Sequence, residues 1–218
     1  RLLPGDLPLI GFCGSPWTLA AYSIEGGGSK DFNKTKSFMK EHPEELKEFL
    51  DILSNACYEY LRQQVLSGVN ALQIFDSWAD LLSENDLEIF SLHYTRKLTS
   101  LLKADPVTSN IPIILFEKAP KKNIIEIVFE DIACVSLFWQ EDIGSVNKVL
   151  RNQYAIQGNL DPKILLESDE LIWNETQKIC SIMNKYPGFI FNLGHGITPD
   201  INPDKVQVMI DALRAEAS

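Results

Sequence analysis

The stretch "IPIILFE", Ile111–Glu117, is apolar at almost every position before it ends on an acidic residue. A strand with one solvated face would alternate apolar and polar residues, whereas a strand of a parallel sheet is buried on both faces and is apolar nearly throughout. Five other runs share this character: "PLIGFCG" (Pro8–Gly14), "ALQIFD" (Ala71–Asp76), "ACVSLFW" (Ala133–Trp139), "YAIQGNL" (Tyr154–Leu160) and "GFIFNLG" (Gly188–Gly194). The sequence therefore predicts six parallel strands.

The segments between these runs have helical spacing. In Pro43–Ser67 the apolar residues recur every three or four positions, with a proline near the start and Gly68 just past the end, as is typical of helix termini. Further helices are predicted at Glu84–Lys103, Lys121–Asp131, Ile143–Leu150, Lys163–Lys185 and Pro203–Arg214. The chain is therefore a β-α repeat, and no linker divides it.

Repeated β-α units form either an open doubly wound sheet or a (β/α)8 barrel. An eight-unit barrel takes ~250 residues, so six units would take ~180 and leave room for one insertion after the first strand. Polar residues at the ends of most runs favour the barrel. We therefore predict an α/β fold of the (β/α)8 TIM type. Residues 1–218 would form a single, incomplete domain that supplies about six units and lacks two N-terminal ones.

Composition restricts the partners and the location. The net charge of −10 argues against a surface for nucleic acid or for an anionic membrane. The four cysteines are scattered and form no Cys-x-x-Cys pair, which is typical of reduced, buried thiols rather than of disulfides. No apolar run approaches the ~20 residues of a membrane helix, and we expect no signal peptide. These features predict a cytoplasmic protein.

In either architecture the active site lies beyond the carboxyl ends of the strands. His195 follows the last run, in "FIFNLGHGITPD" (Phe189–Asp200), and stands between Gly194 and Gly196. Flanking glycines permit close backbone approach, and a histidine there can titrate near neutral pH or donate a hydrogen bond to a ligand. A structural histidine that caps a turn is the alternative.

Three other features carry two interpretations each. Asp76 and Ser77 can supply an acid/base group and a hydrogen bond, or Asp76 can cap a following helix. The segment "EGGGS", Glu25–Ser29, can form a backbone nest for an anion or a flexible loop. Tyr22, just before it, can bring its hydroxyl to a ligand or simply pack among its alanine neighbours.

Two kinds of site are not predicted. A Gly-x-Ser-x-Gly nucleophile elbow is absent from the sequence, so a Ser-His-Asp hydrolase is poorly supported. His42 and His93 lie on or beside predicted helices and form no ligand spacing with His195 or a cysteine, so we predict no metal site and two surface histidines.

Four segments, in this order, resemble the uroporphyrinogen decarboxylase family: "PLIGFCGSPWTLAAYSIEGGGSKDF" (Pro8–Phe32), "GVNALQIFDSWADLLS" (Gly68–Ser83), "QGNLDP" (Gln157–Pro162) and "NLGHGITPDINPD" (Asn192–Asp204). The resemblance covers about the last two thirds of such an enzyme. It implies removal of the four acetate carboxyls of uroporphyrinogen to give coproporphyrinogen in haem biosynthesis, without a metal or organic cofactor. It also implies a homodimer.

The resemblance assigns roles to particular residues. Tyr22, Ser77 and His195 match substrate-contacting positions. By their chemistry, Tyr22 and Ser77 would form hydrogen bonds to substrate carboxylates, and His195 would make a polar or cationic contact to a carboxylate. Phe75 would pack against the macrocycle. The family's catalytic acid and its carboxylate-binding arginines belong to the N-terminal portion. The resemblance therefore identifies no catalytic residue in these 218 residues, and we expect the 218-residue chain alone to be inactive.

Two departures from the family pattern leave other functions open. Phe138 stands where the family usually has an acid, and Glu117–Lys122 lacks the usual glycine-containing turn. One alternative is a related corrinoid-dependent zinc methyltransferase barrel, which would need a histidine and two cysteines near strand ends. His195 has no cysteine near it in sequence, and Cys180 lies in a predicted helix. The other alternative is a non-catalytic tetrapyrrole-binding protein.

Overall fold

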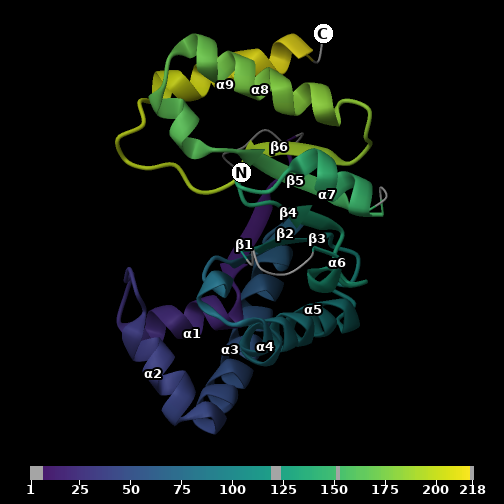
Figure 1. The fold of residues 1–218 in the computed structure, drawn as a ribbon. Helices are drawn as coiled ribbons and strands as arrows, with labels where there is room; N and C mark the ends of the chain where they lie inside the picture. The colour runs from purple at the N-terminus through teal and green to yellow at the C-terminus, as the bar shows by residue number, and fades with distance from the viewer. Residues whose placement is uncertain (1–6, 119–123, 151–152, 217–218) are drawn as a thin grey trace. The chain divides into compact units, whose positions relative to one another are not determined.

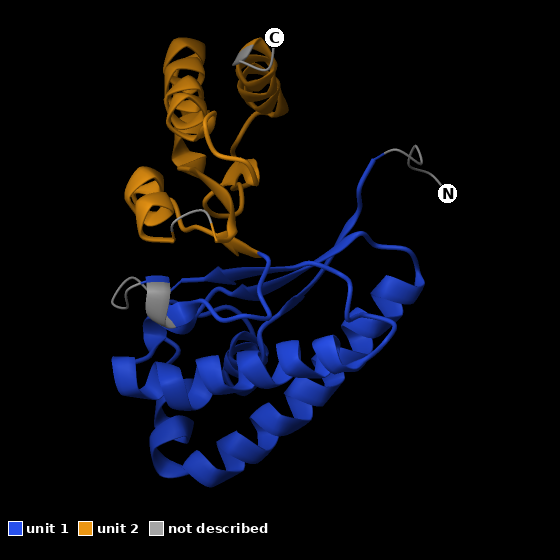
Figure 2. Ribbon diagram, turned by 90° about the vertical axis from the view of Figure 1, so that its right-hand side faces the viewer, with its two compact units in different colours: residues 1–133 blue, residues 134–218 orange. Residues whose placement is uncertain are grey.

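The structure is a computed structural model that describes residues 7–118, 124–150 and 153–216 (Figure 1). The chain forms two compact units, residues 1–133 and residues 134–218 (Figure 2). Each unit contains three parallel strands with helices packed beside them.

The first unit contains strands β1 (Ile10–Gly14), β2 (Ala71–Asp76) and β3 (Ile113–Glu117), which pair in parallel in this order. Its helices lie on one face of the three strands (Figure 2). They are α1 (Pro16–Glu25), α2 (Asn33–Glu41), α3 (Pro43–Leu66), the 3-10 turn η1 (Ala79–Leu81), α4 (Glu84–Asp86), the π-helix η2 (Leu87–Leu92), α5 (His93–Ala104) and α6 (Ile124–Ile127).

The second unit contains β4 (Cys134–Ser136), β5 (Ala155–Leu160) and β6 (Phe189–Leu193), also parallel and in chain order. Its helices are α7 (Ile143–Leu150), the 3-10 helix η3 (Pro162–Leu166), α8 (Asp169–Met183) and α9 (Pro203–Glu216). Leu165, Ile172 and Ile201 form a buried cluster against which residues of α9 pack. Across the described part of the chain, no helix is long and apolar enough to span a membrane.

All six predicted strands and their parallel direction are confirmed, with ends that move by at most three residues. The segment after the first strand, predicted only as an insertion, forms α1 and α2. The predicted helix Glu84–Lys103 contains a π-helical stretch. The predicted helix Lys163–Lys185 is divided because Ser168 Oγ accepts a hydrogen bond from Leu171 N–H and starts α8.

The segment Glu25–Ser29 connects α1 to α2. Gly26 ends α1 with φ of 89°, a left-handed conformation that favours glycine. The Glu25 carboxylate then accepts hydrogen bonds from Thr35 N–H and Thr35 Oγ1, both at 3.1 Å, in the first turn of α2. The Glu25 side chain thus serves the start of the next helix, a contact that neither predicted interpretation of this segment, an anion nest or a flexible loop, includes.

The two faces of the first unit's sheet differ. Cys13 and Ile74 point toward the helices and are buried, and Cys57 of α3 donates from its thiol to Gly14 O at 3.7 Å. Phe12, one residue before Cys13 in β1, is 60% exposed. Because successive strand residues point to opposite faces, Phe75 lies on the Phe12 face, and their rings meet edge-on at 6.0 Å.

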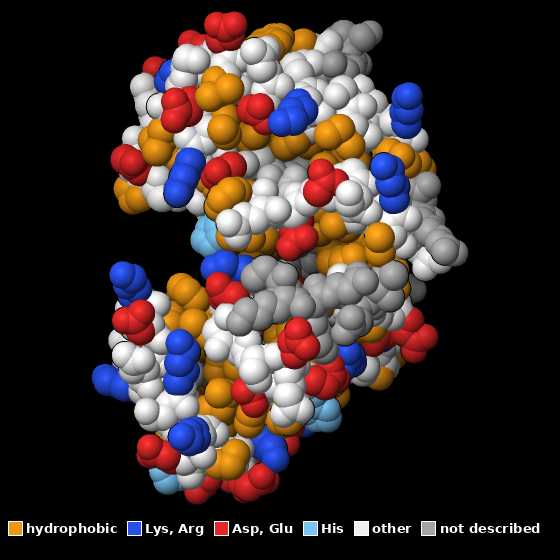
Figure 3. All heavy atoms as spheres, viewed as in Figure 1, with side chains coloured by type: hydrophobic (Ala, Val, Ile, Leu, Met, Phe, Trp, Pro, Cys, Tyr) orange, Lys and Arg blue, Asp and Glu red, His pale blue; other side chains and the backbone are white. Residues whose placement is uncertain are grey.

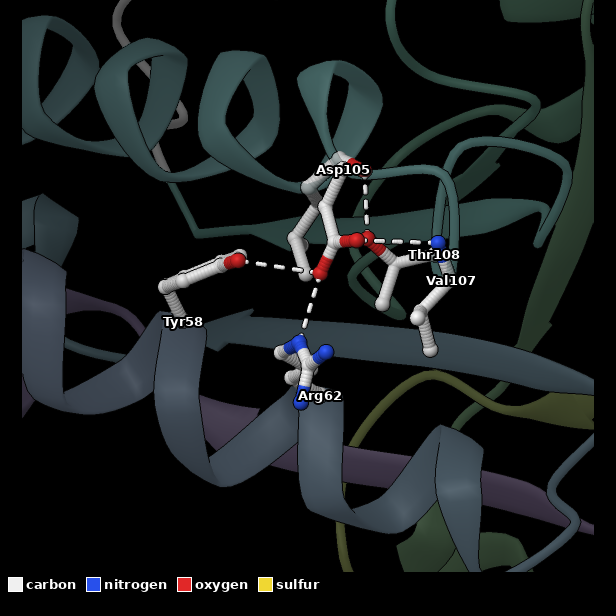
Figure 4. A network of polar contacts seen from close by, with 6 residues as sticks. Tyr58, Arg62, Asp105, Val107 and Thr108 are labelled. Atoms are coloured by element: carbon white, nitrogen blue, oxygen red, sulfur yellow. Dashed lines mark hydrogen bonds and ion pairs between the residues drawn. The ribbon is translucent and has the colours of Figure 1, made fainter.

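A polar network joins α3 to the segment between α5 and β3 (Figure 4). The Asp105 carboxylate accepts from Val107 N–H at 2.9 Å, from the Tyr58 hydroxyl at 2.9 Å and from Arg62 Nε at 2.7 Å. The backbone N–H of Val107 is the main cause that lowers the pKa of Asp105, and Tyr58 and Arg62 lower it further. The ionised carboxylate is therefore the form that the folded protein favours.

Replacing Asp105 by asparagine should destabilise the full-length protein at pH 7 and change its response to acid. A lowered folded pKa gives stability that is present above the ordinary aspartate pKa of ~3.9 and is lost as pH falls through the folded value. Urea unfolding at pH 7 and pH 3 measures this. The difference in unfolding free energy between wild type and Asp105→Asn should shrink at pH 3. An equal difference at both pH values would contradict it.

Candidate functional site

The carboxyl end of β2 carries the two site residues predicted from its sequence. Phe75 is partly buried, and its ring lies 5.9 Å from that of Phe116 on β3. Ser77 is the first residue after the strand, in a turn, and is partly exposed. The chain just before Ser77 is held, because Ser15 N–H donates to Phe75 O at 2.8 Å and Lys118 N–H donates to Asp76 O at 3.1 Å.

Asp76, between Phe75 and Ser77, has no exposed surface. One carboxylate oxygen accepts a hydrogen bond from Thr18 Oγ1 at 2.9 Å, and the other accepts one from Ser91 Oγ. Burial raises the pKa of Asp76, while hydrogen bonds from Ser91, Thr18 and Ser15 oppose that shift. A group closed to solvent cannot exchange protons with a substrate, so the predicted acid/base role does not suit Asp76.

Tyr22 lies beside the turn that contains Ser77. It projects from α1 with 38% of its surface exposed, and its ring meets the Trp78 ring edge-on at 5.9 Å. Trp17 Nε1 donates to Trp78 O at 2.9 Å, which fixes this turn to α1. Three of the predicted site residues, Tyr22, Phe75 and Ser77, thus lie on the carboxyl side of the first unit's strands.

The first unit also places a cation at this edge. Lys118 directly follows β3, and its Nζ lies 2.9 Å from Asp80 Oδ2 and 5.6 Å from the centre of the Trp78 ring. The side chains of Lys118 and Asp80 are 18% and 28% exposed. Lys118 is not among the site residues predicted from the sequence. Its position immediately after a predicted strand was the signal that could have identified it.

His195 follows β6 in the second unit and is exposed. Its Nδ1 accepts a hydrogen bond from Gly196 N–H at 2.9 Å, so Nε2 is the ring nitrogen farther from the backbone. The Phe138 ring meets the imidazole edge-on at 6.0 Å. Phe138, which stands where the resemblance leads one to expect an acid, therefore gives His195 an apolar neighbour.

The two glycines beside His195 have different surroundings. Gly194 is buried and donates from its N–H to Leu160 O at 2.8 Å. A Cβ at position 194 would lie 2.5 Å from Trp139 Cα and closer still to its backbone nitrogen, whereas one at Gly196 would meet open space. The glycine at 194 is therefore required by a contact within the protein, and only Gly196 suits the predicted role in ligand approach.

The segment after β4, which carries Phe138 and Trp139, is held from β5. The Asn159 side-chain amide donates to Phe138 O at 2.9 Å and to Glu141 O at 2.7 Å. Asn159 is buried, and both acceptors lie in the segment that Gly194 packs against. Burial raises the pKa of Glu141. The surroundings of His195 are thus built by β4, β5 and β6 together.

Comparison with known proteins identifies the family. The model of the family "Uroporphyrinogen decarboxylase (URO-D)" matches residues 1–216. The chain belongs to the uroporphyrinogen decarboxylase family. It is 42% identical over 213 residues to the uroporphyrinogen decarboxylase of Pseudomonas putida (strain W619), which covers 98% of this chain and 60% of that protein. It is 40% identical to that of Ruthia magnifica subsp. Calyptogena magnifica, covering 98% and 61%.

The fold agrees with this assignment. A methyltransferase from Methanosarcina mazei matches all of this chain and 61% of its own with a TM-score of 0.75, at 18% sequence identity. At that identity the likeness shows the fold alone, and it confirms the predicted α/β architecture of parallel strands alternating with helices, as part of a barrel. The chain spans about 60% of the length of the curated uroporphyrinogen decarboxylases it matches.

Most of the Glu117–Lys122 departure, residues 119–122, lies outside the described residues. The four cysteines are unpaired and buried, as predicted. Within the described ranges, histidine, cysteine, aspartate and glutamate side chains form no group of three or more that could hold a metal ion.

Proposed function

We propose that the full-length protein is a uroporphyrinogen decarboxylase. It would remove the four acetate carboxyls of uroporphyrinogen and release coproporphyrinogen in haem biosynthesis. The observation that carries this proposal is the 42% identity to a uroporphyrinogen decarboxylase over 98% of the chain. The activity belongs to the whole protein, and the 218-residue chain alone is expected to be inactive because the family's acid and arginines belong to the N-terminal portion.

The substrate contacts proposed here are Tyr22, Phe75, Ser77 and His195. The hydroxyl groups of Ser77 and of the exposed residue Tyr22 suit hydrogen bonds to carboxylates. Phe75, whose ring contacts those of Phe12 and Phe116, provides an apolar surface for a pyrrole ring. His195 is exposed after β6 and suits a polar contact to a further carboxylate. Each role rests on family position together with exposure.

The proposed chemistry uses the substrate as its own electron sink. Protonation of a pyrrole ring at its α-carbon gives a cation, which accepts the electrons released when carbon dioxide leaves, and the resulting methylene is then reprotonated. The protein would hold the polyanionic macrocycle and stabilise positive charge on its rings. No metal or organic cofactor is needed for these steps.

Charge distribution is relevant because the substrate is anionic and the chain carries a net charge of −10. Acidic and basic side chains alternate across the face drawn in Figure 3. Local cations must therefore offset the overall field. Lys118 lies at the carboxyl edge of β3 but already pairs with Asp80, so the family's arginines would supply the offsetting charge.

A homodimer in the cytoplasm is part of the proposal. Light scattering of the purified full-length protein would measure its mass in solution. A mass of one chain would remove the dimer from the proposal without affecting the proposed activity.

Anaerobic incubation of the full-length protein with uroporphyrinogen, followed by oxidation and chromatography, tests the activity. Stepwise loss of carboxyls down to the four-carboxyl product is expected. Substrate binding without conversion would favour the non-catalytic tetrapyrrole-binding protein. Neither binding nor conversion, together with zinc in the purified protein, would favour the methyltransferase barrel.

A further inference from the structure

We propose that Asp76 is a positioning residue: its buried carboxylate, held by hydroxyl groups of α1 and of the π-helix η2, fixes the end of β2 so that Ser77 faces the substrate. This inference rests on the proposed role of Ser77 in substrate binding. Asp76 itself touches no solvent and takes no part in the chemistry.

Hydroxyl groups from separate elements meet the Asp76 carboxylate. Thr18 in the first turn of α1 donates to one oxygen at 2.9 Å, and Ser91 of η2 donates to the other. Thr18 and Ser91 are themselves buried, at 4% and 0% exposed. A buried carboxylate is stabilised only when such partners replace water. Burying this carboxylate costs free energy, and its hydrogen bonds join the end of β2 to two helices.

The π-helix is a second observation that points to this contact. A π-helical turn is rare and occurs mostly where a function or contact compensates for its poorer backbone geometry. Here it spans Leu87–Leu92 and includes Ser91, whose hydroxyl reaches Asp76. We infer that the wider turn is retained because it brings Ser91 to the carboxylate.

Ser77 is fixed as a consequence. Backbone hydrogen bonds hold Phe75 O and Asp76 O before it, and Trp17 Nε1 holds Trp78 O after it. The Asp76 side chain is a further anchor next to Ser77, and its hydrogen bond from Ser91 links this position to η2. Weakening it should move or loosen the Ser77 hydroxyl relative to substrate, while leaving the groups that perform the chemistry in place.

Asp105 provides the matched control. It is also a carboxylate that accepts several hydrogen bonds within the first unit (Figure 4). It lies before β3, at the amino end of that strand, whereas Asp76 lies at the carboxyl end of β2. Asparagine at either position keeps the shape and removes the charge. A purely structural effect should therefore be similar in the two variants.

The test compares Asp76→Asn, Ser91→Ala and Asp105→Asn in the full-length protein. We expect Asp76→Asn to raise KM for uroporphyrinogen roughly three- to tenfold with little change in kcat, as the weakening of one hydrogen bond predicts. Ser91→Ala should act in the same direction and is the informative variant if Asp76→Asn does not fold. Asp105→Asn should lower the unfolding temperature and leave KM unchanged.

A double variant decides whether Asp76 acts through Ser77. If it does, Asp76→Asn combined with Ser77→Ala should raise KM no more than Ser77→Ala alone. Multiplied effects of the two substitutions, or a loss of stability with unchanged KM in Asp76→Asn, would overturn the inference.

Amide hydrogen exchange separates this inference from the proposed function. Exchange in residues 75–82 should quicken in Asp76→Asn and Ser91→Ala but not in Asp105→Asn. If wild type neither binds nor converts uroporphyrinogen, the proposed function fails. Exchange then still decides the structural claim, since unchanged protection of residues 75–82 would show that Asp76 does not hold this turn.

Discussion

Replacing His195 by alanine in the full-length protein is expected to lower kcat/KM for uroporphyrinogen roughly 10- to 100-fold, the loss of one hydrogen bond to a charged group. The imidazole is exposed, and its ring meets that of Phe138 edge-on at 6.0 Å. Because little buried surface is lost, the unfolding temperature should stay within a few degrees of wild type. Steady-state kinetics and thermal unfolding of the same preparation measure both quantities.

His93 supplies the matched control for this prediction. It is also exposed, and its ring also meets an aromatic ring edge-on, that of Tyr94 at 4.9 Å. It lies at the start of α5, where its side chain lines a surface pocket with Lys47 of α3. His93→Ala should leave kcat/KM unchanged. Equal kinetics for wild type and His195→Ala would remove His195 from the proposed site, and equal losses in both histidine variants would point to a general structural effect.

The strands could be predicted from the sequence because parallel sheets leave a strong compositional signal. In β3 every residue is buried, as its nearly continuous apolar character predicts. Strand β1 is also apolar at nearly every position, yet Phe12 is 60% exposed. Alternate residues of β1 lie on the face of the sheet opposite the helices. Composition identifies a strand but does not say how completely each face is covered.

The helices after β1 could not be predicted from apolar spacing alone. In α2 only Thr35 is buried, so its sequence has no apolar stripe to recognise. Its start depends on Glu25, ten residues earlier, whose carboxylate binds Thr35 N–H. Such a cap is a tertiary contact, and a local pattern search for helix starts does not include it.

The site residues show the same division between local and tertiary information. Ser77 and His195 could be selected because each follows a predicted strand. The burial of Asp76 could not be predicted, since its hydroxyl partners Thr18 and Ser91 are 58 and 15 positions away in sequence. The pairing of Lys118 with Asp80 likewise depends on two strand ends coming together. Strand order predicts which ends are neighbours, but not which side chains pair.

Replacing Gly194 by alanine is expected to destabilise the full-length protein by about 3 kcal/mol, the cost of forcing a methyl group into a packed site. The added Cβ would lie 2.5 Å from Trp139 Cα and 2.7 Å from Trp139 Cβ. These atoms belong to or adjoin the backbone, so a rotamer change cannot relieve the overlap. The midpoint of urea unfolding should fall accordingly.

Gly196→Ala is the control that separates packing from backbone flexibility. A Cβ at position 196 meets no atom within 4 Å, so this variant should unfold at the wild-type urea concentration. If both glycines were present only to let a ligand approach, both variants would be as stable as wild type, and only their activities would differ from that of wild type. A normal midpoint for Gly194→Ala would contradict the packing account. The alternative outcome is a lowered midpoint for Gly194→Ala together with a normal midpoint and normal activity for Gly196→Ala. That outcome would assign Gly194 to the fold and leave His195 as the functional residue of this turn.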